Sequence, residues 1–480
     1  MWDFKKNPGY DHFCICTNQY FFIMLTTQIQ YDMLYHSIAG STMKYTILFI
    51  ALLLICAFFA GCTQQAQAPA QPKEIKIGAI VSMTGPNSNI GKNMWQSAVI
   101  ATDEINANGG IFVKQYNAKI PIKLVQGDDE STREGGQKAV TKLITDDKVD
   151  ILIGGYSSAV TSAYEQTVAE FKVPYVVTGA SSPIITHRPD IDTSYVFHHC
   201  PTTDAYGMYT TNFIDQVIRP AVDKKFNFPA DRPFRLALLY QDTGFGIGVK
   251  TAVNDTITKN NLNIQLVSQQ SYKMGESDFR TVLTNIKATN PDAVYLAAAP
   301  NEGAQIIPQA RRDVGLNTIF LNVENNDAPE FYKGIGQYGE YAIIESRFSP
   351  YVTPTGVLSG AQTSFKNNYN TKWGSYPDMM GASTYEGTYI AAKAIETAGT
   401  LNKTDIRQAL VDLKMPQLIE YMKDGSISFS KDYRESTFDL WMEQLYYNAT
   451  LGETRPTIVW PDSIKTIDFT LPDWYKPGSS

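Results

Sequence analysis

The chain has 480 residues, of which 43% are hydrophobic and 19% are charged, and its formal net charge at pH 7 is -7. This length is sufficient for two domains with separate hydrophobic cores, and the composition is typical of a globular protein rather than of a disordered or membrane-embedded chain. Because the net charge is negative and no basic stripe stands out, we expect no interaction with nucleic acid.

An apolar run at residues 45–60 follows a short basic start at Met43 and Lys44. The run is shorter than the roughly 20 apolar residues that span a bilayer, and it has the length of the apolar region of a signal peptide. It ends in Phe-Ala-Gly-Cys, which resembles the lipobox of bacterial and archaeal lipoproteins. In that motif, small residues precede a cysteine that is lipidated and becomes the new N-terminus after cleavage. We therefore predict a signal peptide at residues 43–61 and lipidation of Cys62.

The segments on either side of this predicted signal peptide show no apolar periodicity. We expect residues 1–42 to be an over-extended reading frame with Met43 as the true start; the alternative is a genuine cytoplasmic extension. Residues 62–73 are rich in Gln, Ala and Pro, a composition typical of a flexible tether. These features predict an extracytoplasmic protein that is anchored to the cell membrane through its lipid.

Strands and helices alternate along the rest of the chain. In the first block the predicted elements are a strand at 74–83, a helix at 91–106, a strand at 120–125, a helix at 132–145, a strand at 150–153, a helix at 159–171 and a strand at 175–178. Such alternation is typical of βαβ units and a parallel sheet.

The alternation restarts after residue 233. The second block has strands at 235–240, 264–268, 293–299 and 319–322, and helices at 246–260, 278–289 and 304–314. Two helical stretches at 357–373 and 381–399 and a strand region at 437–447 follow. Two blocks predict two open α/β lobes. Because ligands of open parallel sheets bind outside the carboxyl ends of the strands, two facing lobes form one cleft.

Five motifs occur in order along this part of the chain. They are IGAIVSMTGPNSNIGKNMWQSAVIATDEINANGGI (77–111), DDEST (128–132), GGYSSAVTSAYEQTVAEFKVPYVVTGASSP (154–183), QARRDVGLNTIFLNVE (309–324) and GASTYEGTYIAAKAIETAG (381–399). Together they resemble the leucine/isoleucine/valine-binding proteins of ABC transporters, and the resemblance extends from residue 73 to about residue 447.

The resemblance implies a two-lobed type I periplasmic-binding-protein fold with three hinge crossovers. Lobe 1 is expected to comprise residues 74–199 and 354–434, and lobe 2 residues 200–353 and 435–480. The implied function is that of a monomeric substrate-binding protein, which captures a branched-chain or related amino acid by hinge closure. Its implied partners are the small-molecule ligand, the permease and ATPase subunits of an importer, and the lipid bilayer through the N-terminal anchor.

The resemblance also implies which residues hold an amino acid. The ligand carboxylate is expected at Ser158, where a helix N-terminus with free N–H groups favours an anion. Ser157 and Ser158 also fit a simpler role as caps of that helix. Ser181 is expected to give the carboxylate its hydroxyl or amide, the carbonyl of Gly179 to accept from the ammonium group, and Glu324 to be the acidic partner of that ammonium group.

The expected walls of the site depart from the family pattern. Tyr156, Phe245 and Tyr385 are the predicted wall residues, with Phe245 replacing a common tyrosine. A family aromatic is missing near Ala299, and another is replaced by Ile90. The preference for the ligand side chain therefore does not follow from the resemblance.

Other chemistry finds little support in the sequence. Cys14 and Cys16 near His12 lack the four ligands of a structural zinc site, and His198 and His199 beside Cys200 fit a packed hinge better than a metal site. The GFGIG sequence at 244–248 lacks the last glycine of a dinucleotide loop. We expect no metal, no cofactor and no enzymatic activity.

Three alternatives stay open at this stage. In the first, the ligand is an amide, a urea-like solute or an aromatic acid instead of an amino acid. In the second, the chain is the ligand-sensing module of a receptor, which uses the same fold. In the third, it is a hydrolase of an amino-acid derivative. Likeness of fold alone does not choose among these functions.

Overall fold

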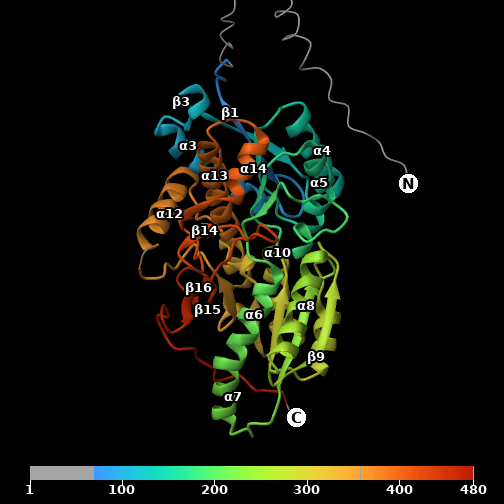
Figure 1. Ribbon diagram of the computed structural model, residues 1–480. Helices are drawn as coiled ribbons and strands as arrows, with labels where there is room; N and C mark the ends of the chain where they lie inside the picture. The colour runs from blue at the N-terminus through green and yellow to red at the C-terminus, as the bar shows by residue number, and fades with distance from the viewer. Residues whose placement is uncertain (1–69, 357, 479–480) are drawn as a thin grey trace, which may run out of the picture. The chain divides into compact units, whose positions relative to one another are not determined.

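The computed structural model describes residues 70–356 and 358–478, and the predicted signal peptide and Cys62 lie outside them. The described chain forms two main sheets with helices packed on them (Figure 1). No helix within the described residues is both long enough and apolar enough to cross a membrane. The α/β architecture with parallel strands, predicted from the alternation of elements, is confirmed.

The first sheet is entirely parallel and has the order β4-β1-β5-β6-β7. Its strands are β1 (Ile75–Val81), β4 (Ile122–Asp128), β5 (Ile151–Gly154), β6 (Tyr175–Val177) and β7 (Val196–His198). The helices associated with it are α3 (Ser88–Ala107), α4 (Arg133–Thr145), α5 (Ser158–Phe171), α12 (Ser359–Trp373), α13 (Met379–Ala398) and α14 (Lys403–Val411). Helix α13 comes late in the chain and α3 comes early, and the two helices pack along each other (Figure 1).

The second sheet has the order β16-β15-β12-β11-β10-β8-β9. Its strands are β8 (Phe234–Gln241), β9 (Ile264–Tyr272), β10 (Ala293–Ala297), β11 (Ile319–Asn322), β12 (Ile343–Ser346), β15 (Trp441–Asn448) and β16 (Glu453–Trp460). The first five of these pair in parallel, whereas β15 and β16 are antiparallel to their neighbours. Its helices are α6 (Thr203–Phe213), α7 (Arg219–Phe226), α8 (Gly244–Lys259), α9 (Arg280–Ala288), α10 (Pro300–Pro308) and α11 (Pro329–Ile335).

Short elements complete the described fold. Two small hairpins are formed by β2 (Ile111–Val113) with β3 (Ala118–Ile120) and by β13 (Lys414–Pro416) with β14 (Ser426–Ser428). Wider helical turns follow α6 at Ile214–Ile218 and α10 at Gln309–Val314. Single 3-10 turns lie at Lys114–Tyr116, Pro183–Ile185, Glu324–Asn326 and Gly336–Gly339.

Most predicted elements agree with the structure to within a few residues, but one helix differs for a clear reason. The predicted helix 304–314 starts earlier, at Pro300, where proline suits the first helical turn because it needs no N–H partner. Its regular part ends at Pro308, which has no N–H to donate, and a wider turn continues to Val314. Helices α6, α7, α11 and α14 and strands β12 and β16 were not predicted.

The described chain passes between the two sheets three times. The first passage follows β7, the second follows β12, and the third runs from β14 to β15. The first and third passages lie side by side, because the amide of His198 donates to Arg434 O at 2.8 Å and the amide of Ser436 donates to His198 O at 2.9 Å. The amide of Tyr421, between β13 and β14, donates to Arg347 O at 3.2 Å, which brings the second passage against the β13–β14 hairpin that precedes the third.

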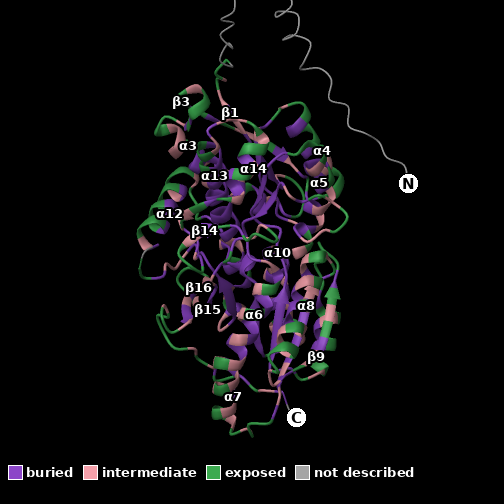
Figure 2. Cartoon of the chain, in the orientation of Figure 1, coloured by how far each residue is buried: buried purple, intermediate pink, exposed green. Residues whose placement is uncertain are grey.

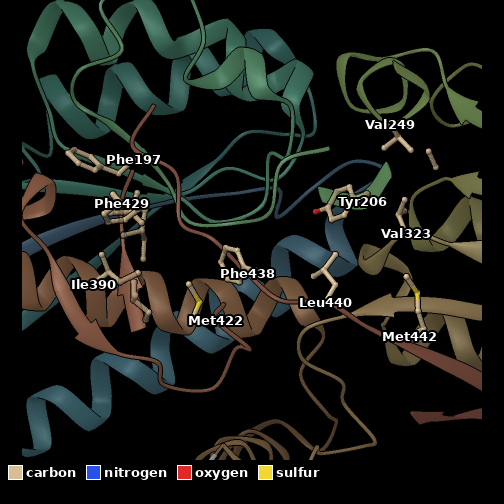
Figure 3. Packing of buried hydrophobic residues seen from close by; sticks show 14 of the residues in the cluster. Phe197, Tyr206, Val249, Val323, Ile390, Met422, Phe429, Phe438, Leu440 and Met442 are labelled. Atoms are coloured by element: carbon tan, nitrogen blue, oxygen red, sulfur yellow. The ribbon is translucent and has the colours of Figure 1, made fainter. Parts of the chain in front are cut away.

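The largest hydrophobic core extends through these passages rather than stopping at either sheet. Figure 3 shows Phe197 of β7, Phe429 and Phe438 of the third passage and Met442 of β15 as members of one buried cluster. The strands of both sheets are mostly buried, and the outward faces of the flanking helices are exposed (Figure 2). Burial of this continuous apolar surface stabilises the contact between the sheets.

Candidate functional site

A cavity of about 30 Å³ lies where the carboxyl ends of strands from both sheets meet. The residues that line it come from both sides: Asn87, Tyr156, Ser157, Ser158, Gly179, Ser181 and Met380 with the first sheet, and Tyr206, Gln241, Thr243, Phe245, Met274, Ala299, Val323 and Asn325 with the second. Among these described lining residues none carries a formal charge at pH 7. Position and lining both match the expected ligand site of an open α/β fold.

The turn between β5 and α5 places Ser158 at the cavity. Gly154 and Gly155 have φ angles of 102° and 80°, which residues with a side chain rarely adopt. A Cβ on Gly154 would also overlap the carbonyl oxygen of Ile80. The chain can therefore reverse tightly behind β1 and start α5 at the cavity wall.

The start of α5 offers hydrogen-bond donors. Ser157 occupies the N-cap position, but its side chain makes no capping hydrogen bond. Ser158 Oγ accepts a hydrogen bond from the amide of Ser182 at 3.1 Å, so its own proton is free for an acceptor. The first amides of a helix have no partner within it, and the helix dipole favours an anion there.

Gly179 and Ser181 face this donor end from the loop after β6. A Cβ on Gly179 would lie 3.0 Å from Gly155 O and 3.3 Å from Met380 Sδ, so the site has no room for a larger residue. Ser181 Oγ lies 2.9 Å from Tyr206 Oη and 3.3 Å from the Gly179 carbonyl oxygen. The structure thus brings together three of the four residues expected to hold the ends of an amino acid.

Glu324, the fourth, does not line the cavity, although its neighbours Val323 and Asn325 do. Its side chain is fully buried, forms an ion pair with Arg347, and accepts a hydrogen bond from Tyr206 Oη at 2.5 Å. Burial raises the pKa of Glu324, and the positive charge of Arg347 opposes that rise. The carboxylate therefore stands behind the phenol of Tyr206 rather than in contact with the cavity.

Two of the three expected wall residues line the cavity. Tyr156 is nearly buried, and its hydroxyl accepts a hydrogen bond from Asn325 Nδ2 at 3.3 Å, which ties the two sides of the cavity together. Phe245 lines the cavity at the start of α8. Both residues follow the end of a strand, the position from which open sheets present ligand-binding groups.

Tyr385, the third expected wall residue, does not line this cavity. Its hydroxyl donates to Glu104 Oε2 at 2.6 Å, and its ring packs 4.5 Å from that of Phe365. It lines a separate surface hollow of about 450 Å³. Met380, just over one helical turn earlier on α13, faces the ligand cavity instead, because the face of the helix that carries Tyr385 packs toward α3.

Several lining residues were missed by the sequence analysis. Gln241, Thr243 and Asn325 follow strand ends, so strand position was a usable signal for them. Tyr206 and Met380 come from helices that reach the cavity only through the tertiary fold. No local pattern distinguished those two residues.

A buried group of charged residues joins the three passages beside the cavity. Arg347 of the second passage pairs with Glu324, and its Nε donates to Glu420 Oε1 at 2.8 Å. His199 of the first passage lies with its Nε2 2.9 Å from Glu386 Oε2 and 3.4 Å from Glu420 Oε2. We call Glu324, Arg347, Glu420, His199 and Glu386 the hinge network. All five side chains are fully buried.

His199 lies between two buried carboxyl groups of the hinge network, and the ligand atoms of His199, Glu386 and Glu420 lie close enough together to hold a metal ion. Burial alone would lower the pKa of His199, but its hydrogen bonds to Glu386 and Glu420 outweigh that effect and raise the pKa. Nε2 of the imidazole faces the two carboxyl groups, while Nδ1 lies 3.0 Å from Ser436 Oγ of the third passage. This arrangement agrees with the packed hinge expected at this position.

Comparison with known proteins places this geometry in a family. The profile of the periplasmic binding protein family matches residues 74–442. Leu/Ile/Val-binding protein homolog 7 of Brucella abortus is 22% identical over 364 residues, which cover 74% of this chain and 85% of that protein.

Two solved structures illustrate the shared fold. The branched-chain amino acid transporter substrate-binding protein LivJ of Streptococcus pneumoniae, in complex with isoleucine, has a TM-score of 0.66 and 22% identity, covering 81% of this chain and all of that one. A solute-binding protein of an ABC transporter from R. palustris, in complex with benzoate, has a TM-score of 0.65 and 15% identity, covering 82% and 99%. The chain belongs to the periplasmic binding protein family, in its type I, Leu/Ile/Val-binding-like form, whose members bind substrates outside the cytoplasm.

Proposed function

We propose that this protein captures an α-amino acid, branched-chain or related, and delivers it to the permease and ATPase subunits of an ABC importer. The observation that carries the proposal is the polarity of the uncharged cavity. Ser158 and the start of α5 offer donors for a carboxylate, and the Gly179 carbonyl oxygen on the facing loop offers an acceptor for an ammonium group. Leu/Ile/Val-binding relatives and the isoleucine complex of a protein with the same fold support this ligand class.

A thermal-shift panel tests the ligand class. Free α-amino acids are compared with their deaminated acids and with simple amides. At about 100 times its dissociation constant, a ligand stabilises the fold by about 2.7 kcal/mol, which raises the melting temperature measurably. We expect at least one α-amino acid to do so while its deaminated acid does not. Stabilisation by amides alone would contradict the proposal.

Point variants tie such a shift to the cavity. Ser158→Ala removes one donor but leaves the backbone amides of α5, so we expect it to weaken amino-acid binding by about 1 kcal/mol. Ser277→Ala changes an exposed serine that does not line the cavity and is the matched control. Isothermal titration calorimetry measures both. Equal affinities of the two variants would show that the ligand binds somewhere else.

An aromatic acid is the second candidate ligand. The rings of Tyr156 and Phe245 line the cavity, and a protein of the same fold was solved with benzoate. Such a ligand uses the donors at the start of α5 and has no need for acceptors at the opposite side. Benzoate and 4-hydroxybenzoate therefore belong in the thermal-shift panel, where a large shift with either would favour this alternative.

Ligand entry requires the two sides of the cavity to separate, because about 30 Å³ accommodates only about two water molecules. Two hydrogen bonds join the two sides: Asn301 Nδ2 donates to Pro86 O at 3.1 Å, and the amide of Thr203 donates to Ser181 O at 2.9 Å. We propose that lobe 1 (74–199 and 354–434) and lobe 2 (200–353 and 435–480) hinge apart at the three passages. Small-angle scattering is expected to show a smaller radius of gyration with ligand; an unchanged profile at saturation would contradict hinge closure.

We also propose that the mature protein starts at Cys62 and carries lipid there, with residues 62–73 as its tether. The basic start, the apolar run and the Phe-Ala-Gly-Cys sequence support this step. Mass spectrometry of membrane-extracted protein tests it, and Cys62→Ser is expected to release the protein from the membrane. Recovery of an N-terminal peptide from residues 1–42 would contradict both the cleavage and the start site.

A further inference from the structure

Tyr206 connects the ligand cavity to the hinge network. It lies on α6, lines the cavity and is nearly fully buried. Its hydroxyl oxygen is 2.5 Å from Glu324 Oε1 on one side and 2.9 Å from Ser181 Oγ on the other. The same oxygen thus touches a buried carboxylate and a residue of the cavity wall.

The positions of the protons follow from the chemistry of these groups. Glu324 is paired with the guanidinium of Arg347, which keeps it an acceptor, and a phenol has one proton to give. Tyr206 therefore donates to Glu324 and accepts from Ser181. The hydroxyl proton of Ser181 is then used within the protein, so Ser181 presents lone pairs rather than a donor to the cavity.

The cavity consequently offers two unlike sets of groups. Ser158 keeps its proton available to a ligand, because its Oγ accepts from the Ser182 amide. The second set consists of acceptors, namely Ser181 Oγ, Tyr206 Oη and the Gly179 carbonyl oxygen. Acceptors grouped in this way suit an ammonium group, which has N–H donors and no lone pair.

The carboxyl group behind Tyr206 favours a cation at these acceptors. The hinge network places three carboxyl groups, of Glu324, Glu386 and Glu420, around the guanidinium of Arg347 and the imidazole of His199. Glu324 is the member of the network that contacts the Tyr206 hydroxyl. In addition, the buried Glu324 Oε2 has no hydrogen-bond partner among the described residues.

We propose that Tyr206 recognises the ammonium group of the ligand and transmits to it the negative charge of Glu324, which does not touch the ligand. This inference rests on the proposed function, because it needs an α-amino acid as ligand. It reassigns Ser181 from the carboxylate to the ammonium end of that ligand. It also accounts for the buried position of Glu324 directly behind a cavity-lining phenol.

Calorimetry with Tyr206→Phe tests the proposal, with the best-binding α-amino acid of the panel and its deaminated acid as probes. The variant is expected to bind the amino acid 10- to 100-fold more weakly and the deaminated acid as well as the parent does. Tyr209→Phe is the matched control, since Tyr209 lies on the same helix, donates to Asp439 Oδ1 at 2.8 Å and does not line the cavity. It is expected to leave both affinities unchanged.

Ser181→Ala provides a second test that does not depend on the folding of Tyr206→Phe. If Ser181 contacts the ammonium group, the substitution weakens binding of the amino acid and leaves the affinity for the deaminated acid unchanged. With Ser181 as a carboxylate donor, both probes lose affinity equally, which would overturn the proposal. Unchanged amino-acid affinity in a folded Tyr206→Phe would also overturn it while leaving the proposed function intact. A parent protein that binds no α-amino acid would overturn both.

Discussion

The ligand cavity and the hinge network lie on opposite sides of Tyr206, and they are built from different chemistry. The described lining residues of the cavity are uncharged and offer hydroxyls, carboxamides, backbone groups and aromatic rings. The hinge network holds five charged side chains out of contact with solvent. The cavity can therefore open and be solvated at little electrostatic cost, whereas opening the network would separate or hydrate buried charges.

This difference shows how one fold can combine a charged, fully buried junction between its sheets with an uncharged cavity. The network contributes one residue from each of the first two passages, His199 and Arg347, and Glu420 from the β13–β14 hairpin that precedes the third. A bending motion that keeps these contacts must pivot near them. Paired buried charges are costly to disrupt one partner at a time, which restricts the passages to a few arrangements.

Arg347→Met should produce the largest effect because it breaks the network at its centre. Glu324 and Glu420 would each lose a buried cationic partner, and removal of one member of a buried ion pair costs about 3–5 kcal/mol. Urea unfolding measures the loss. Arg280→Met removes an exposed arginine paired with Asp278 and is the control, for which no measurable change is expected. Equal stabilities of the two variants would mean that the network does not stabilise the hinge.

Gly154→Ala should have the next largest effect, and it acts on the cavity side of the comparison. The substitution forces a side chain into a φ of 102° and against the Ile80 carbonyl oxygen. The left-handed conformation alone costs about 1–2 kcal/mol, and relief of the overlap adds to it. Gly275→Ala is the matched control, because Gly275 has a φ of 83° and nothing within 4 Å of a Cβ. If both variants lose the same stability in chemical unfolding, the close packing behind the β5–α5 turn is unimportant.

The pH dependence of stability tests the bridging proton of His199. Its folded-state pKa is raised by Glu386 and Glu420, which face its ring together with Ser436, while Arg347 lies beyond Glu420. A raised pKa means that the stabilisation is complete below the unfolded value near 6.5 and is lost as pH rises through the folded value. The melting temperature of the parent should therefore fall above about pH 6.5.

His199→Gln should flatten that part of the pH profile, since glutamine does not titrate. The variant is expected to be less stable than the parent at pH 6, with the difference narrowing as the pH rises. Ser277→Ala, an exposed site outside the network, serves as the control and should keep the slope of the parent. Differential scanning calorimetry from pH 6 to 9 measures all three proteins. A parallel decline in parent and His199→Gln would show that another group carries the dependence.

Much of the fold followed from local patterns. Alternating strands and helices predicted both sheets, because buried parallel strands are continuous apolar runs bounded by turns. Strand β12 was missed although it lies inside the second sheet, since its sequence IIES has only two apolar residues before the polar but buried Glu345 and Ser346. Helix α6, which carries Tyr206, was missed too. Its buried residues are shared among the cavity, the passages and the second sheet, so they form no single apolar stripe.

The residues expected from the family resemblance line the cavity where a strand end delivers them directly. Ser158, Gly179 and Ser181 follow β5 and β6 within a few residues, and all three line the cavity. Glu324 also follows its strand closely, yet its side chain turns toward Arg347, a partner 23 positions later that no local pattern indicates. Long-range ion pairing is the physical reason why position after a strand was not sufficient.

Tyr385 lines the surface hollow near α3 and not the ligand cavity, and its substitution should have the smallest effect. Tyr385→Phe removes the hydrogen bond to Glu104, which also accepts from Tyr389 at 2.8 Å, so the expected loss of stability is only about 1 kcal/mol. Ligand affinity should not change, because the tyrosine does not line the cavity.

Phe245→Ala, in contrast, removes a ring from the cavity wall and should weaken binding of an apolar amino acid by about 1–2 kcal/mol. Calorimetry that found the reverse order, with Tyr385→Phe weakening binding and Phe245→Ala tolerated, would move the binding site from the cavity to the hollow.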